Sequence, residues 1–127
     1  MWIVRWNDKT SALSSTDDVL NTIKSLHNTY LELDPIIVQI ENPVGDLIMI
    51  GLGNSQYSIV NYYPINSNYS LFPKGEYTED GTICFYMGDD ESEFYIRDTI
   101  HYETAIKILE CFLANGNIYK TIEWQRD

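Results

Sequence analysis

The sequence IIVQI at residues 36–40 and the sequence LIMIGL at residues 47–52 decide the fold. Both runs are apolar and rich in β-branched side chains, which favour β-strands. The turn residues PVGD at positions 43–46 lie between them, and GNS at positions 53–55 leads to a third apolar run at residues 57–63. This pattern predicts successive antiparallel strands joined by tight turns.

One amphipathic helix is predicted before these strands and one after them. Residues 14–18 (SSTDD) supply hydroxyl caps and first-turn acids, and apolar side chains then recur at helical spacing up to Leu33, ahead of Pro35. The second helix is indicated by an apolar stripe that ends at Asn115-Gly116, a typical C-terminal cap. The stripe consists of Tyr102, Ala105, Ile106, Leu109, Phe112 and Leu113.

Shorter strands are expected at residues 2–6, 82–87, 93–96 and 118–124, and residues 64–81 are expected to form a long surface connection. The predicted fold class is therefore α+β: a single domain over residues 1–127, with a mostly antiparallel sheet of about six to seven strands and two packed helices. We expect no internal repeat.

Composition limits the function classes. The chain has 127 residues, 8 Lys and Arg against 19 Asp and Glu, and a formal net charge of −11, which argues against nucleic acid as a partner. Its apolar runs are too short for a membrane helix, and the N-terminus does not resemble a secretory signal. Cys84 and Cys111 lie in apolar segments and are expected to be reduced core thiols. We therefore expect a cytoplasmic protein that does not bind membranes.

The residues that usually carry catalysis are scarce. His27 and His101 are the two histidines, and both are interpreted as structural residues that lie at the surface or cap a helix. Gly51-Leu52-Gly53 lacks the third glycine and the following helix of a dinucleotide loop, so a bulge or tight turn is the better interpretation. The acids at residues 89–93 lack the spacing of a calcium loop. The sequence thus predicts a protein without catalytic residues, metal or cofactor.

Residues 57–98 combine tyrosines with acids. Seven of the ten tyrosines fall there, together with eight carboxylates. Tyrosine is enriched at protein interfaces, and clustered acids attract a basic partner over a long range. A binder of a basic protein is therefore one interpretation. In the other, alternate tyrosines fill the core and the acids keep a small domain soluble.

The C-terminal third carries a family resemblance. Its elements are Glu93-Phe94, Glu103 and Ala105 at the start of the helix, the Asn115-Gly116 stop, and Ile122-Glu123-Trp124-Gln125 at the end; residues 50–53 (IGLG) add to them. With these motifs the chain resembles an immunity-protein family of bacterial polymorphic toxin systems, the first-numbered of the Imm families. The resemblance covers roughly residues 36–125. His101 stands where members often carry a proline, and residues 64–81 match no pattern.

The resemblance implies an α+β protein that binds the C-terminal domain of a cognate toxin in the producing cell and neutralises it without catalysis. Many toxins of these systems attack nucleic acid and are basic, which suits an acidic inhibitor. Gly51, Gly53 and Trp124 are expected to be framework residues. The toxin-binding surface is expected to include Tyr69, Tyr77, Glu79, Asp80, Asp89, Asp90 and Glu91.

Two other classes stay open at this point. One is a small acidic enzyme that binds a ligand or metal and uses carboxylates as acid and base. The other is a homodimeric adaptor that uses Trp2, Trp6 and the first strand as an exposed sheet edge. The sequence does not determine the oligomeric state or the chemistry of the toxin.

Overall fold

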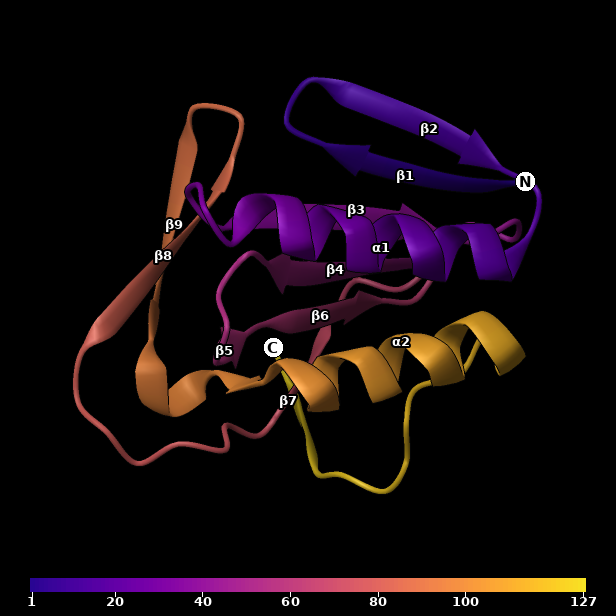
Figure 1. Cartoon of the computed structure of the whole chain (residues 1–127). Helices are drawn as coiled ribbons and strands as arrows, with labels where there is room; N and C mark the ends of the chain where they lie inside the picture. Colours follow the sequence, from indigo (N-terminus) through magenta and orange to yellow (C-terminus); the bar gives the residue numbers. More distant parts are fainter.

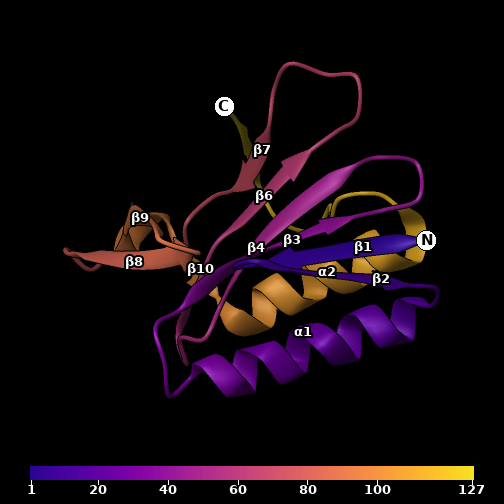
Figure 2. The same ribbon diagram turned by 90° about the horizontal axis from the view of Figure 1, so that it is seen from above.

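The computed structural model describes all 127 residues as an α+β fold with two α-helices that cover one face of a sheet (Figures 1 and 2). The helices are α1 (Thr16–Tyr30) and α2 (Tyr102–Asn115), and η1 (Ile96–Asp98) is a single 3-10 turn. The strands are β1 (Trp2–Trp6), β2 (Lys9–Leu13), β3 (Ile36–Glu41), β4 (Leu47–Leu52), β5 (Tyr57–Ser58), β6 (Val60–Tyr63), β7 (Leu71–Pro73), β8 (Thr82–Met87), β9 (Asp90–Tyr95), β10 (Ile100–His101) and β11 (Trp124–Arg126).

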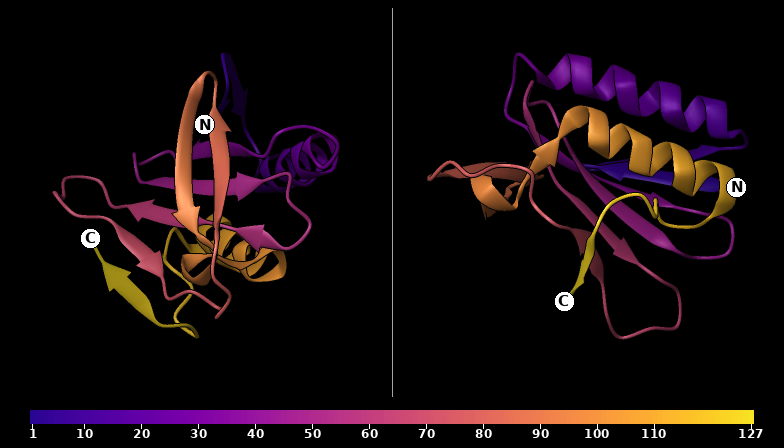
Figure 3. Two further views of the ribbon diagram at one scale, coloured as in Figure 1. Left: turned by 90° about the vertical axis from the view of Figure 1, so that its left-hand side faces the viewer. Right: turned by 90° about the horizontal axis from the view of Figure 1, so that it is seen from below.

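The main sheet has nine strands. Seven follow the order β11-β7-β6-β4-β3-β1-β2, and all neighbours along this path are antiparallel. The hairpin of β8 and β9 joins the sheet through one parallel bridge, Ile36 to Tyr86, and β5 pairs separately with β10. Figure 3 shows this hairpin standing at the ends of the central strands. The mostly antiparallel α+β prediction is confirmed, with more strands than the expected six to seven.

The larger core lies between the helices and the sheet face that they cover. Val4, Ile40 and Ile48 occupy opposed positions on β1, β3 and β4, and all three are fully buried. Because side chains alternate along a strand, the residues between them point to the other face. The register of β3 and β4 therefore decides what the uncovered face presents.

Both helices have the predicted caps. The Ser15 hydroxyl accepts a hydrogen bond of 3.0 Å from the Asp18 N–H at the start of α1. At the end of α2, Gly116 has a left-handed backbone (φ 69°) and its N–H bonds the Phe112 carbonyl. The α1 helix ends at Tyr30, earlier than expected, and Leu33 is exposed beyond it. No helix has the length and apolar character that crossing a membrane requires.

The first strand is not an edge strand. β1 lies between β2 and β3, Trp2 is buried, and Trp6 packs against the core. The adaptor hypothesis placed these residues at an exposed edge, and that premise is wrong. The missed strand β2 forms the edge: its sequence KTSAL lacks apolar alternation, and it pairs because the turn at Asn7 (φ 51°) folds it back onto β1.

Two other predictions need correction. The segment of residues 64–81 contains β7, a strand of three residues held between β6 and β11. The expected strand over residues 118–124 is instead irregular chain, and β11 begins only at Trp124. Tyr119 and Ile122 pack against the core from this irregular segment, so their apolar character reflects burial and not strand pairing.

Candidate protein-binding surface

The sheet face opposite the helices carries a mixed polar and apolar surface. Two cross-strand rows lie on it: Arg5-Gln39-Met49-Asn61 and Ile3-Glu41-Leu47-Tyr63. The side chains of these rows are half-buried, apart from the exposed Arg5. No helix covers this face (Figure 2), and the β8–β9 hairpin covers only one end of it. The rows therefore form an open surface beside the hairpin.

A small second core attaches the hairpin to the sheet. Phe85 of β8 is fully buried and packs with Ile37 and Ile59. A Cβ atom at Gly51 would lie 2.7 Å from the Phe85 ring and 2.9 Å from Ile59 Cγ1, so only glycine leaves room for the ring against β4. The sequence indicated that Gly51 permits a bulge or tight turn of the backbone. In the structure its role is to leave space for the Phe85 ring.

The hairpin presents the acids and tyrosines of alternate positions on its outward face. Thr82 opposes Tyr95, Cys84 opposes Glu93, and Tyr86 opposes Glu91. The negative charge of Glu91 raises the pKa of the Tyr86 hydroxyl. Of these residues, the predicted toxin-binding set contains only Glu91. The missing signal is the two-residue period of β8 and β9, which puts Tyr86, Glu93 and Tyr95 on the same face as Glu91.

Cys84 is not a core thiol. It is half-buried on the outward face of the hairpin, where its Sγ donates to a Glu91 carboxylate oxygen at 3.3 Å. That hydrogen bond is the main cause of the raised pKa of the thiol. Cys111 is also only half-buried, so the expectation of two core thiols is wrong. Alternation explains Cys84, because Ile83 and Phe85 on either side take the inward positions.

The tip of the hairpin carries three of the predicted toxin-binding acids. Asp89 and Asp90 are exposed there, and Glu91 begins the outward row. A hydrogen bond connects the tip to the β1–β2 turn: the Gly88 N–H donates to Asn7 Oδ1 at 3.0 Å. A six-residue strand spans about 20 Å, so these acids stand about that far from the base of the hairpin.

Tyr77 and Glu79 lie in a separate cluster at β5 and β10. The Tyr77 hydroxyl donates to the Gln56 carbonyl at 3.0 Å and lies 2.6 Å from His101 Nδ1. Because the hydroxyl has one hydrogen, a Tyr77 that donates to Gln56 accepts from Nδ1. Tyr57 packs edge-on against Tyr77 and donates to a Glu79 oxygen at 3.2 Å. Burial raises the pKa of both tyrosines, and Glu79 adds to the effect.

The predicted toxin-binding residues thus fall into three places. Asp80 is exposed and forms an ion pair with Arg97 at 3.3 Å, next to the Tyr77 cluster. Tyr69 lies away from both, with the Arg126 guanidinium 4.1 Å from its ring centre. One place is the Tyr77 cluster and its neighbourhood, which contains Tyr77, Glu79 and Asp80. The second is the hairpin tip, which contains Asp89, Asp90 and Glu91. Tyr69 lies in the third place, beside β7 and β11.

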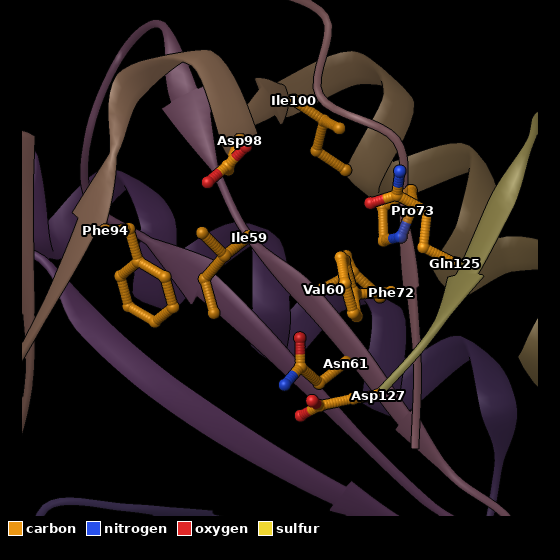
Figure 4. A pocket seen from close by; sticks show the side chains of 10 residues that line it. All are labelled: Ile59, Val60, Asn61, Phe72, Pro73, Phe94, Asp98, Ile100, Gln125 and Asp127. Carbon is orange, nitrogen blue, oxygen red and sulfur yellow. The ribbon is translucent and has the colours of Figure 1, made fainter. Parts of the chain in front are cut away.

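A groove of about 390 Å³ lies between the hairpin base and the β7–β11 pair (Figure 4). Its walls are largely apolar, from Ile59, Val60, Phe72, Pro73, Phe94 and Ile100. Its polar lining residues are Asn61, Asp98, Gln125 and Asp127. No sequence pattern predicts this groove, because four segments far apart in the chain contribute to it.

His27 is a buried structural residue on the helical side. Its Nδ1 accepts a hydrogen bond of 3.0 Å from the Gly53 N–H, and its ring stacks on Tyr102 at 3.6 Å between centroids. Burial lowers the pKa of His27, and the negative charge of Glu103 partly opposes this. Gly53 has φ +96° and approaches Tyr30 closely, which restricts this turn to glycine. His27 was expected at the surface or at a cap, and that expectation is wrong.

The remaining framework residue, Trp124, opens β11 and packs against the main core. Its indole Nε1–H donates to the Tyr119 carbonyl at 2.7 Å, which fastens the irregular C-terminal segment. No group of three or more His, Cys, Asp and Glu side chains is placed to hold a metal ion. No protein-family model and no curated protein sequence matches this chain.

Proposed function

We propose that this chain is a non-catalytic immunity protein that binds the C-terminal domain of a cognate toxin in the cytoplasm of the producing cell and neutralises it. The observation that carries the proposal is the β8–β9 hairpin, which stands out from the sheet with tyrosines and carboxylates on its outward face. The resemblance to the immunity-protein family supports the same class. Its motifs at Gly51 and Trp124 lie at the two points that fix the hairpin and the C-terminal segment.

The electrostatics favour a basic partner. The chain has 19 Asp and Glu residues, and only Glu41, Asp80 and Glu123 take part in ion pairs. The acids of the hairpin tip and outward face are therefore not neutralised by bases of this chain. A concentrated negative field of this kind raises the association rate of a positively charged protein.

A toxin that attacks nucleic acid fits this field best. Such an enzyme needs a cationic cleft for phosphate groups, and carboxylates on a projecting hairpin supply negative charge that the cleft attracts. The exposed Tyr95 and the half-buried Tyr86 on the outward face then add contact area with a polar tip. In this proposal the hairpin occupies the place of the nucleic-acid backbone, and inhibition requires no chemical step.

The size of the surface is sufficient for a stable complex. A standard interface buries about 800 Å² on each partner, a patch roughly 30 Å across. The hairpin alone is about 20 Å long, so the interface extends from the tip along the outward face to Glu79 and the Tyr77 cluster, or onto the open rows of the sheet. Tyr69 lies on another side and is the weakest member of the predicted set.

The proposal is tested by capture followed by rescue. Tagged protein is incubated with lysate of its own cell at low and moderate salt, and a bound protein is identified by mass spectrometry. The C-terminal domain of that protein is then expressed in a test host with and without this chain. We expect the domain to be lethal alone and harmless with the chain; a captured domain whose lethality is unaffected contradicts the proposal.

A charge-reversal pair tests the hairpin itself. Asp89→Lys with Asp90→Lys should slow association with the toxin domain about tenfold and reduce its dependence on salt. Asp17→Lys with Glu110→Lys makes the same change of charge on the helical layer and serves as the matched control. Equal association rates for the two double variants would remove the hairpin tip from the interface.

A further inference from the structure

We infer that the groove between the hairpin base and the β7–β11 pair accepts a basic segment of the partner, in which one apolar side chain enters the groove between two cationic residues. This inference rests on the proposed function, because it places part of the toxin. It concerns a surface that neither the hairpin tip nor the Tyr77 cluster includes.

The shape of the groove sets the apolar part of the ligand. Its volume of about 390 Å³ lies within the range of sites that bind small groups. Ile59, Val60 and Ile100 are buried lining residues, Phe94 lies on one side of the groove, and Phe72 lies beside Val60 (Figure 4). Binding becomes more favourable when an apolar side chain displaces water from an exposed groove lined in this way.

The ends of the groove set the charge of the ligand. Asp98 lies near Phe94 at one end, and Asp127 lies beside Asn61 at the other (Figure 4). Both carboxylates are exposed, and neither forms an ion pair with a basic side chain of the chain. Two unpaired negative charges that flank an apolar lining complement a basic–apolar–basic segment and disfavour an acidic one. Arginine suits both ends, because its guanidinium can bond a carboxylate with two donors.

The groove is tested on the protein alone with short peptides followed by 15N and methyl NMR. The probe is acetyl-Arg-Leu-Arg-amide; acetyl-Arg-Gly-Arg-amide lacks the apolar side chain, and acetyl-Glu-Leu-Glu-amide reverses the charge. We expect saturable, millimolar binding of the first peptide, with the largest shifts at Ile59, Val60 and Ile100. The glycine peptide should bind several-fold more weakly, and the acidic peptide should not bind.

Two pairs of substitutions separate the groove from general attraction. Asp98→Asn with Asp127→Asn should weaken binding of the arginine–leucine peptide about fivefold, the effect of two exposed charge pairs. Asp89→Asn with Asp90→Asn removes the same charge at the hairpin tip and should leave the affinity within about twofold, since the tip is more than a Debye length of about 8 Å away at physiological salt.

Several results would overturn the inference. These are the absence of saturable shifts, equal binding of the leucine and glycine peptides, and equal weakening by the two double variants. The spectrum of each variant shows directly whether it is folded. Because the peptides are read without the toxin, a negative result together with successful rescue of the test host overturns the groove alone. A positive result without rescue supports the groove and contradicts the immunity function.

Discussion

The contact of Gly51 with Phe85 predicts how firmly the hairpin is held. In Gly51→Ala the new Cβ would lie 2.7 Å from Phe85 Cε1 and 2.9 Å from Ile59 Cγ1. Carbon atoms pack best at about 3.5–4.0 Å, so both neighbours must move by close to 1 Å. Overpacking of this kind costs about 1–3 kcal/mol, and the reduced freedom of the unfolded chain returns about 0.4–1 kcal/mol. We expect a net loss of about 1–2 kcal/mol in the free energy of unfolding.

A double-mutant cycle isolates this contact. Phe85→Ala alone removes a fully buried ring and should cost about 3–5 kcal/mol. In that background the contact with Ile59 Cγ1 at 2.9 Å remains, but Ile59 can move into the space that the ring leaves, so Gly51→Ala should cost less than about 1 kcal/mol. The coupling between the two sites is then about 1 kcal/mol. Urea unfolding followed by tryptophan fluorescence and circular dichroism measures all four proteins.

A control glycine lies on the same hairpin. A Cβ at Gly88 would meet no atom within 4 Å, although its backbone is left-handed (φ +61°). Gly88→Ala should therefore cost about 1 kcal/mol through its backbone alone and show no coupling to Phe85→Ala. The reasoning is refuted if Gly51→Ala is harmless beside Phe85, or if its cost is the same after the ring is removed.

Three further predictions concern stability. Burial lowers the pKa of His27 from 6.5, so the unfolded chain binds the proton more tightly than the folded chain does. The free energy of unfolding should therefore be highest above about pH 7.5 and decline as the pH falls through about 6.5 and below. Urea unfolding from about pH 5 to 8 should show this decline, and His27→Gln should make the pH dependence weaker. Gly75→Ala places a Cβ against the Arg97 carbonyl oxygen and should lower the free energy of unfolding by about 2–3 kcal/mol. An unchanged urea midpoint would contradict this and show that the backbone here can move at little cost. Trp124→Phe removes the indole donor to Tyr119 and should cost about 1 kcal/mol and increase hydrogen exchange in β11; unchanged exchange would contradict its fastening role.

The candidate surface shows where sequence reasoning reached its limit. The grouping of tyrosines and acids in residues 57–98 was visible, and so was the hairpin that carries Asp89 and Asp90. The sequence did not predict that Tyr69 and Tyr77 lie far apart, because the path of a long loop cannot be predicted from its sequence. The sequence also did not show that Tyr86 and Tyr95 lie on the outward face, because this depends on the register of β8 and β9.

The sequence by itself determined the local elements. Apolar runs predicted β3 and β4, capping residues predicted the start of α1 and the end of α2, and the glycine at position 53 indicated a special backbone geometry. Each of these depends on side-chain periodicity or on backbone preference within a few residues, which a sequence records directly.

Only the tertiary structure decided the long-range pairings. β2 and β7 have weak strand sequences and form because a partner strand offers unpaired backbone groups, β1 for the former, β6 and β11 for the latter. The same holds for His27, whose Nδ1 meets the Gly53 N–H from a turn 26 residues away. Such contacts depend on the shape of the whole chain, and the groove beside β11 exists only because that shape brings its walls together.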